Sequence, residues 1–235
     1  MRERESDFYK RIPNWIHPTK AFLDVVTAHL NKDSIVLDLG AGSGNTAEIP
    51  LKGRVKKVIG LDLVAEVMSN PYLDEAIIGS VYNIPLPDSS VDLVFSDHVM
   101  EHLEHPLEAC QEVFRILKPQ GHFVFRTTNV LSCFGLASRL APISFKRWLK
   151  KSMFGVDDKD VFPTKYRLNT LYKIKAVLSK AGFSEERLFT NDTEPNYFVW
   201  SKIAFHLWLG IRNILNRVSF LHYFREVILA DFVKL

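Results

Sequence analysis

The stretch VLDLGAGSG, residues 36–44, is the part of the sequence that decides the fold. Its apolar residues surround Asp38 in a run that resembles a buried strand, and glycines then occupy positions 40, 42 and 44. Glycine lets the main chain turn sharply and approach a ligand without an intervening Cβ. The stretch therefore predicts a strand that ends in a ligand-binding turn.

Short runs rich in β-branched and aromatic residues recur along the chain, separated by segments with helical spacing. The expected strands are 34–39, 56–63, 75–80, 91–96 and 121–127, and the closing segment 225–235 is expected to be a last, antiparallel strand. Helices are expected over 19–30, over 45–51 after the glycines, and over 107–119, where Pro119 should end the helix. This alternation indicates an α/β fold with a doubly wound, mostly parallel sheet covered on both faces.

Composition narrows the class of protein. A chain of 235 residues fits one domain, and a net charge of +3 is too small to indicate a nucleic-acid partner. Cys110 and Cys133 lack metal-site spacing, which is typical of reduced thiols in a cytoplasmic protein. The charged N-terminal segment does not resemble a signal peptide, and no uninterrupted apolar run is long enough to predict a spanning helix.

The glycine spacing points to the kind of ligand. A dinucleotide-binding turn reads G-x-G-x-x-G, whereas this chain has G-x-G-x-G and Asn45. A nucleoside without phosphates fits better, because Asp38 under the turn would repel a pyrophosphate but can hold a cationic amino-acid group. Asp62 ends the next strand, 18 positions after Gly44, where an acid can accept hydrogen bonds from both ribose hydroxyls.

These motifs resemble those of the class I S-adenosylmethionine-dependent methyltransferases, in their small-molecule (type 11) branch. VLDLGAGSG and GLDL (60–63) match the first two motifs, and residues 79–106 and RILKPQGHFVF (115–125) resemble the later ones. The resemblance covers roughly residues 30–128 closely, and 171–183 with the closing strands more loosely. It implies a seven-stranded Rossmann-like sheet and S-adenosylmethionine as cofactor. The cofactor-binding residues that it implies are Asp38, Gly40, Ala41, Gly42, Gly44, Asp62, Leu63, Ser80, Val81 and Ser96; the family often has an acid where this chain has Ser80.

Catalysis on a hydroxyl requires removal of a proton, for which histidine is suited near neutral pH. Similar small-molecule O-methyltransferases place a catalytic histidine where His102 stands, so we expect His102 to be the base and His98 to be the second candidate. On a helix starting near Asp97 the two would share one face. Two alternatives stay open: a structural role at the helix end, and half of a metal site made by His98, Glu101 and His102, similar to the ligand set of ubiquinone-biosynthesis O-methyltransferases. We expect no bound metal.

The acceptor should be recognised by residues 128–170, which are longer than a link in this fold requires and are expected to form a lid. Residues 138–155 within this region contain no acid, and five basic residues interleave there with aromatic ones: Arg139, Lys146, Arg147, Lys150 and Lys151. This pattern is typical of a helix that binds an anionic ligand or a membrane surface, or of a lid with a solvated basic face. Tyr166 and Arg167 are the candidate substrate ligands.

A second helical insertion is expected over 197–218, before the last strand. Its aromatic, amphipathic pattern fits core packing, a membrane surface or a dimer contact.

Function is expected to be methyl transfer to a hydroxyl of a sugar, glycan or lipid-linked intermediate, since similar stretches to 162–170 occur in methyltransferases of polysaccharide gene clusters. A second hypothesis is O-methylation of a quinone-like or other lipophilic molecule. A third, from another class, is a cofactor-binding protein without catalysis. The expected partners are a small-molecule or glycan acceptor and, for a cytoplasmic protein, peripheral contact with the inner face of the membrane. The sequence does not identify the acceptor or the oligomeric state.

Overall fold

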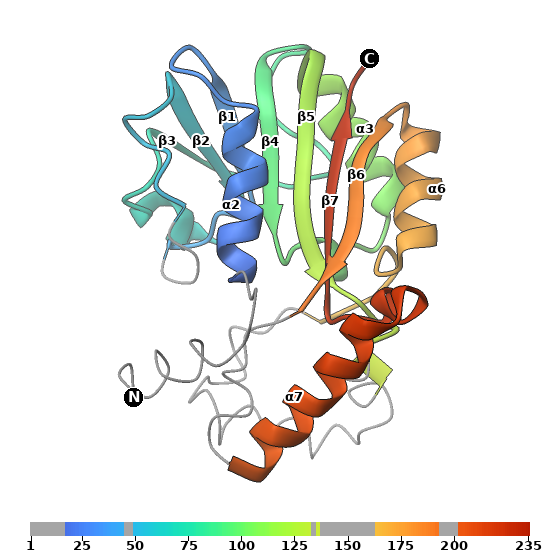
Figure 1. The fold of residues 1–235 in the computed structure, drawn as a ribbon. Coiled ribbons are helices and arrows are strands. Elements are labelled where there is room, and N and C mark those ends of the chain that lie inside the picture. The colour runs from blue at the N-terminus through green and yellow to red at the C-terminus, as the bar shows by residue number, and fades with distance from the viewer. Residues whose placement is uncertain (1–16, 45–48, 133–134, 137–162, 193–201) are drawn as a thin grey trace. The chain divides into compact units, whose positions relative to one another are not determined.

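The computed structural model describes residues 17–44, 49–132, 135–136, 163–192 and 202–235 of the 235. Seven described strands form one sheet in the order β3-β2-β1-β4-β5-β7-β6 (Figure 1). Their bounds are β1 Ile35–Leu39, β2 Lys57–Asp62, β3 Glu75–Ile78, β4 Val91–Asp97, β5 Leu117–Thr128, β6 Ser184–Asn191 and β7 Val227–Val233. The strands run parallel except β7, whose arrow points opposite to that of its neighbours in Figure 1. The α/β class and the antiparallel last strand are thus confirmed.

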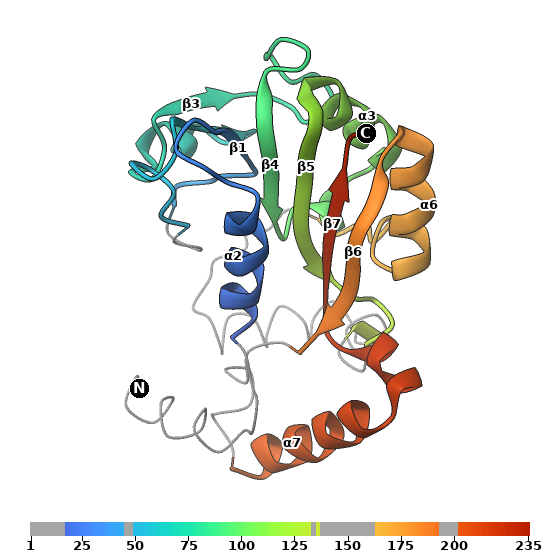
Figure 2. The same ribbon diagram turned by 45° about the horizontal axis from the view of Figure 1, so that its top comes forward.

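Helices cover both faces of the sheet, as Figures 1 and 2 show, with α2 on one face and α3 and α6 on the other. The α-helices are α2 Pro18–Ala28, α3 Pro106–Ile116, α6 Leu171–Ala181 and α7 Lys202–Arg217, and the 3₁₀ turns are η1 Ala65–Ser69, η2 Met100–His102 and η5 Ser219–Phe224. Gly182, with φ of +104°, ends α6 in the left-handed conformation that favours glycine.

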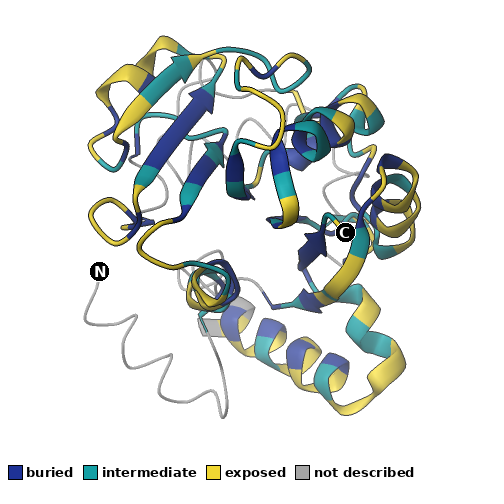
Figure 3. Cartoon of the chain, turned by 90° about the horizontal axis from the view of Figure 1, so that it is seen from above, coloured by how far each residue is buried: buried dark blue, intermediate teal, exposed yellow. Residues whose placement is uncertain are grey.

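Two apolar clusters fill the space between the helices and the sheet. Phe22 and Val26 of α2 pack with Val36 and Phe95 on one face. The opposite face joins residues of α3 and α6 to alternate residues of the same strands, among them Leu37 of β1. Figure 3 shows the result, strands that are mostly buried and helices whose outer surfaces are exposed. A sheet covered on both faces leaves its carboxyl edge as the place where polar side chains can gather.

Three expected helical features differ in the structure. Residues 49–51 are not helical, and 45–48 lie outside the described residues. The helix expected to end at Pro119 ends at Ile116 instead, since the residues before a proline favour extended backbone and β5 begins at Leu117. The helix expected to start near Asp97 is absent: His98 has a φ of +56°, and α3 begins only at Pro106.

The chain divides into two compact units. Unit 2 comprises Phe22–Thr128, Pro163–Phe189 and Ile228–Leu235 and contains most of the sheet. Unit 1 comprises Met1–Ala21, Asn129–Phe162 and Thr190–Val227, and α7 within it realises the helical insertion expected over 197–218. The predicted basic lid segment 139–154 lies outside the described residues.

Candidate functional site

The carboxyl ends of β1 and β4 mark the place where the strand order reverses. From β1 the chain continues through β2 and β3 on one side, and β4 and β5 lie on the other. Ligands of doubly wound sheets bind at such a switch point. The predicted cofactor residues of unit 2 all lie in or just after β1 to β4, so the fold gathers them along one edge.

The glycine turn after β1 is held in a conformation that other residues rarely adopt. Gly40 and Gly44 have φ of +83° and +80°, and a Cβ on Gly40 would come within 2.1 Å of Val99 Cγ2. Gly42 has a φ of +48°, but no atom of the described residues lies within 4 Å of the position that its Cβ would take. The turn is therefore packed on its inner side and open above Gly42.

Asn70, which no sequence pattern singled out, holds this turn in place. Its buried side-chain amide donates to the carbonyl oxygens of Ala41 at 2.9 Å and Gly42 at 3.2 Å. Its Oδ1 accepts from the backbone N–H of Tyr72 at 3.0 Å. A single asparagine in the turn after η1 gives no signal of this role, which depends on η1 packing beside β2 and β3.

The acids of the site serve two purposes. Asp62, at the end of β2, accepts hydrogen bonds from the backbone N–H groups of Gly42 at 2.8 Å and Val64 at 3.2 Å, so it supports the glycine turn. Asp97, at the end of β4, is neutralised by the guanidinium of Arg126, with Nη2 2.7 Å from Oδ2. Asp38 has no ion-pair partner among the described residues.

The environment of Asp38 favours its neutral form. Burial, followed by the negative charges of Asp97 and Asp62, raises the pKa of its carboxyl from 3.8 to about 8. A cationic ligand group would reverse this effect by pairing with the ionised carboxylate. The predicted role of Asp38, holding a cationic end of the ligand, is consistent with this requirement.

The other predicted cofactor residues divide into two groups. Leu63 is largely exposed beyond β2, and Ser80 and Val81 follow β3, where Ser80 Oγ accepts from the N–H of Tyr82 at 3.2 Å. Ser96, in contrast, is fully buried, and its hydroxyl donates to the Leu39 carbonyl at 2.9 Å. The hydroxyl of Ser96 thus links β4 to β1, and the role of this residue in cofactor binding stays a prediction.

His98, directly after β4, forms a pair with a buried acid. Its Nδ1 lies 2.9 Å from Glu101 Oε1, and 41% of the His98 side chain is exposed. Glu101 is buried and also accepts from the hydroxyls of Thr127 at 2.7 Å and Thr128 at 3.2 Å. Asn169 donates in turn to Thr127 Oγ1 at 2.8 Å. Neither threonine was predicted, because only the fold brings the end of β5 to η2.

Charge coupling within this pair shifts both pKa values. Burial alone would lower the pKa of the His98 imidazole, but the hydrogen bond and charge of Glu101 raise it above 6.5. Burial alone would raise the pKa of Glu101, but His98 and Thr127 hold it below its usual 4.5. The arrangement is an imidazole fixed at Nδ1 by a carboxylate, with its remaining nitrogen at the carboxyl edge of the sheet.

His102 lies apart from this pair. It ends η2, and its Nδ1 is 3.3 Å from the carbonyl oxygen of Pro163. The expectation that His98 and His102 share a helical face is wrong, because the left-handed backbone at His98 separates the two. In the described part of the chain, His98, Glu101 and His102 also do not bring three metal-ligand atoms together.

The two predicted substrate residues lie on the segment that η2 holds. The backbone N–H groups of Lys165 and Tyr166 donate to the Glu101 carbonyl at 2.8 and 3.1 Å. Arg167 is exposed and forms an ion pair with Glu104, which also pairs with Lys165 Nζ at 2.8 Å. Lys165 and Arg167 thus share one acid, Glu104.

Comparisons with known proteins agree with this geometry. Residues 37–125 match the family model of a methyltransferase domain. The chain is 33% identical over 140 residues to a malonyl-[acyl-carrier protein] O-methyltransferase of Marinomonas sp., covering 56% of this chain and 47% of that protein. It is 36% identical over 106 residues to a probable S-adenosylmethionine-dependent methyltransferase of Mycolicibacterium smegmatis, covering 43% and 41%. The chain thus spans less than half the length of these curated relatives.

A solved structure extends the likeness of the fold. The putative methyltransferase in complex with the Trm112 methyltransferase activator of Haloferax volcanii superposes with a TM-score of 0.64 at 18% identity, covering 98% of this chain and 92% of that one. At this identity the match supports the fold alone. No described helix is both long and apolar enough to cross a bilayer.

Proposed function

We propose that this chain transfers a methyl group to a hydroxyl of a small acceptor and that His98 is the base. Residues 37–125 belong to the S-adenosylmethionine-dependent methyltransferases, which is why a methyl transfer is expected. The cofactor of this family is S-adenosylmethionine. The observation that carries the proposal is the His98–Glu101 pair beside the glycine turn, with Nδ1 and Oε1 2.9 Å apart.

The residues present fit this cofactor. Among the described residues, the space above Gly42 is open to a nucleoside, and no cation pairs with Asp38, where the amino-acid end would provide one. We expect Asp62 at the ribose and Leu63, Ser80 and Val81 around the adenine. When bound, S-adenosylmethionine supplies an electrophilic methyl group, so the chain's own residues must orient the acceptor and take its proton.

His98 is suited to the proton step. Glu101 accepts a hydrogen bond from the Nδ1–H of His98, which leaves the Nε2 lone pair for the proton of the acceptor hydroxyl. Thr127 and Thr128 hold Glu101 in turn, so the imidazole is positioned by a second set of hydrogen bonds. The Nδ1 of His102 lies 3.3 Å from the Pro163 carbonyl oxygen, whereas that of His98 lies against a buried carboxylate, which favours His98 over the base expected from sequence.

The acceptor class follows in part from the need for a base. A carboxylate acceptor, the group that the name of the Marinomonas relative suggests, carries no proton to remove at neutral pH. A His–Glu pair at the edge therefore favours a hydroxyl. Arg167 and Lys165, which share Glu104, would suit an acceptor that also carries a phosphate or carboxylate, as a lipid-linked sugar does.

The exposed face of α7 supports a lipid-linked acceptor. Phe205, Trp208 and Leu215 face inward, and Arg212 pairs with Asp192 at 2.7 Å. The opposite side exposes an apolar row: Ile203, Leu207, Ile211, Ile214 and, just beyond the helix, Val218. Residues 195–225 contain no acid. An apolar row in an acid-free segment fits the surface of an anionic membrane, where each nearby Lys or Arg contributes about 1 kcal/mol.

The proposal is tested with methyl-labelled S-adenosylmethionine and a panel of sugar, polyprenyl-phosphate-linked and phenolic acceptors, with malonyl thioesters included as carboxylate acceptors. His98→Gln should lower kcat by about 10²–10⁴ while cofactor affinity stays within about twofold. His102→Gln is the matched control and should keep near wild-type kcat. If only His102→Gln loses activity, His102 is the base instead of His98. If the protein methylates only malonyl thioesters, the acceptor group is a carboxylate and not a hydroxyl.

A further inference from the structure

Asp97, the last residue of β4, directly precedes the proposed base, and the methyl-transfer proposal does not use its carboxylate. Its Oδ1 lies 3.9 Å from His98 Nε2, the nitrogen that Glu101 leaves for the acceptor. The side chains of Asp97 and His98 are 15% and 41% exposed. Two groups that accept hydrogen bonds therefore lie side by side at the carboxyl edge of the sheet.

Arg126 of β5 holds both groups in place. It is the register partner of Asp97, and its guanidinium bonds both carboxylate oxygens, with Nη2 2.7 Å from Oδ2. The backbone N–H of His98 donates to the Arg126 carbonyl oxygen at 3.0 Å. Arg126 is buried, and its guanidinium carbon lies 5.4 Å from the centroid of the Phe22 ring. Arg126 thus fixes His98 through the main chain and Asp97 through the side chain.

These two groups together need two protons from a ligand. Neutral His98 offers a lone pair at Nε2, and an ionised carboxylate accepts hydrogen bonds but donates none. Arg126 bonds each oxygen of Asp97 once, and a carboxylate oxygen has two lone pairs, so Oδ1 can accept a second hydrogen bond. A single hydroxyl has one proton and can donate to only one of the two groups. The other group would then face the lone pairs of that hydroxyl without a hydrogen bond.

Two hydroxyls that lie close together would satisfy both groups. Hydrogen bonds that run side by side from Nε2 and Oδ1 place their two donor oxygens about as far apart as the acceptors, 3.9 Å, or closer. Gauche hydroxyls on adjacent carbons meet this limit. Hydroxyls that are meta on a benzene ring, or equatorial on alternate carbons of a sugar ring, are too far apart. The geometry therefore favours an adjacent pair.

We propose that Asp97 and His98 bind two hydroxyls on adjacent carbons of the acceptor, one at each group, so that the acceptor is a vicinal diol of a sugar or a catechol. This inference rests on the proposed function, because it takes His98 as the base. His98 Nε2 takes the proton of one hydroxyl, whose oxygen bonds to the methyl carbon as the carbon–sulfur bond breaks and its electron pair stays on sulfur. Asp97 accepts a hydrogen bond from the second hydroxyl, which keeps its proton. The product is a monomethyl ether, which can no longer donate to both groups.

Binding of matched acceptors tests this inference without relying on turnover. Calorimetry of the wild type saturated with S-adenosylhomocysteine compares catechol with resorcinol, and methyl 6-deoxymannopyranoside with its 3-deoxy derivative, which has no adjacent hydroxyls. In one of these pairs the adjacent diol should bind at least about tenfold tighter, the factor expected for a hydrogen bond to a charged group. The pair that shows this preference distinguishes a sugar from an aromatic acceptor. Equal binding within both pairs, or no binding of any of the four probes, would overturn the inference.

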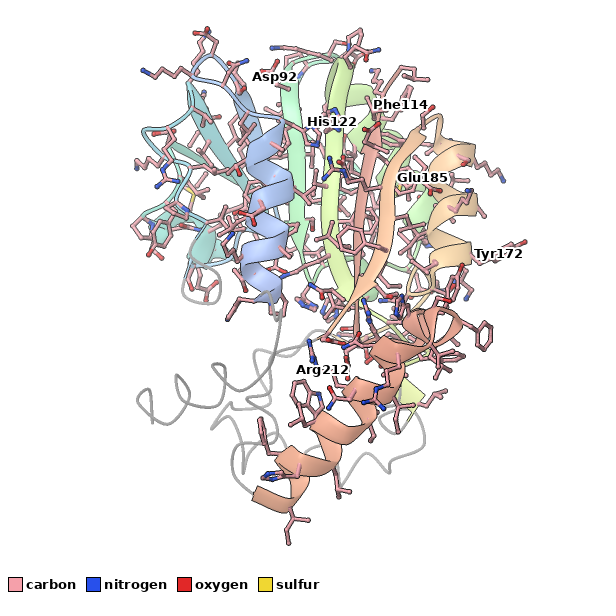
Figure 4. The ribbon with its side chains drawn as sticks, viewed as in Figure 1. Asp92, Phe114, His122, Tyr172, Glu185 and Arg212 are labelled. Atoms are coloured by element: carbon pink, nitrogen blue, oxygen red, sulfur yellow. The ribbon has the colours of Figure 1, made fainter. Side chains whose placement is uncertain are left out.

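Substitution of Asp97 shows whether its carboxylate is the source of that preference. Asp97→Asn should remove the preference for the adjacent diol. Asp92→Asn is the matched control and should keep it, since Asp92 belongs to the same strand and also forms an ion pair, with Lys118 Nζ at 2.8 Å. Figure 4 shows Asp92 near the end of β4 that is opposite its arrowhead, away from His98. A preference that persists in Asp97→Asn would contradict the inference, and the wild-type comparison decides the question even if Asp97→Asn does not fold.

Methyl transfer to the same probes separates this inference from the proposed function. If the protein methylates hydroxyls with no preference for adjacent ones, the proposed function stands and the diol subsite does not. If the adjacent diol binds preferentially but no hydroxyl is methylated, the diol subsite is supported and the proposed function fails.

Discussion

Replacement of Asp38 by Asn is expected to stabilise the cofactor-free protein and, at the same time, to weaken cofactor binding. The folded protein raises the pKa of Asp38 from 3.8 to about 8, so between these pH values ionisation of the carboxyl opposes folding. At about 1.36 kcal/mol per pKa unit, the cost above pH 8 would be at most about 6 kcal/mol. Solvent reaches this partly buried side chain and screens its charge, so we expect a gain of about 1–3 kcal/mol at pH 8.

The sign of the pH dependence follows from the raised pKa. The folded state favours the neutral carboxyl of Asp38. The contribution of this group to the free energy of unfolding of the wild type is therefore greatest below pH 3.8, and it decreases as the pH rises toward about 8. Asp38→Asn removes that loss. The stabilising effect of the substitution should therefore be small at pH 5 and increase up to pH 8.

Urea unfolding at pH 5, 6.5 and 8 measures this effect, with Asp33→Asn as the control because Asp33 is exposed two residues before β1 begins. Calorimetry at pH 8 should show S-adenosylmethionine binding that is at least about tenfold weaker in Asp38→Asn, through loss of a charge-assisted bond. 5′-Methylthioadenosine, which lacks the amino-acid end, should bind both proteins alike. Equal stability of Asp38→Asn and wild type at all three pH values would refute the reasoning about the charge of Asp38.

Three further predictions concern the site and the exposed face of α7. The kcat of the wild type should rise with pH through a midpoint above 6.5, because His98 must be neutral to accept a proton; in Glu101→Gln, pH–rate profiles should show that midpoint shifted downward. Asn70→Ala removes two hydrogen bonds to the glycine turn and should weaken cofactor binding, measured by calorimetry, about 5- to 30-fold. Wild-type protein should sediment with anionic but not neutral liposomes at low salt, and the double substitution Leu207→Asp with Ile211→Asp should remove that binding. If the wild type stays in the supernatant, the exposed face of α7 does not bind a membrane surface.

The strands and the glycine turn after β1 could be predicted because their signals are local. The apolar run of β1 and the three glycines after it are contiguous, and the acid at the end of β2 follows at a fixed distance. Ser96 shows the limit of this reasoning: a residue at the end of a strand can face a ligand or the neighbouring strand, and only the pairing of β4 with β1 decides that it bonds to Leu39.

The parts that sequence reasoning missed depend on contacts between distant segments. The spacing of His98 and His102 suggested one helical face, but the backbone at His98 turns left-handed and places His98 beside Glu101 instead. The pairing of His29 with Asp231 crosses 202 positions and leaves no trace in either local sequence. The role of Asn70 likewise arises only when η1 lies beside the glycine turn.

The claim that the glycine turn after β1 is the cofactor site can be tested most directly by calorimetric titration of S-adenosylmethionine into Gly42→Asn and Gly53→Asn. Both glycines have positive φ, +48° and +79°, and in the described part of the chain no atom lies within 4 Å of either Cβ position. Asparagine tolerates this backbone, so the fold should accept it equally well at both positions. Overpacking the space above Gly42 should cost about 1–3 kcal/mol, or roughly 5- to 150-fold in affinity, while Gly53→Asn should bind as wild type does. Undiminished binding by Gly42→Asn would contradict the placement of the cofactor at this turn.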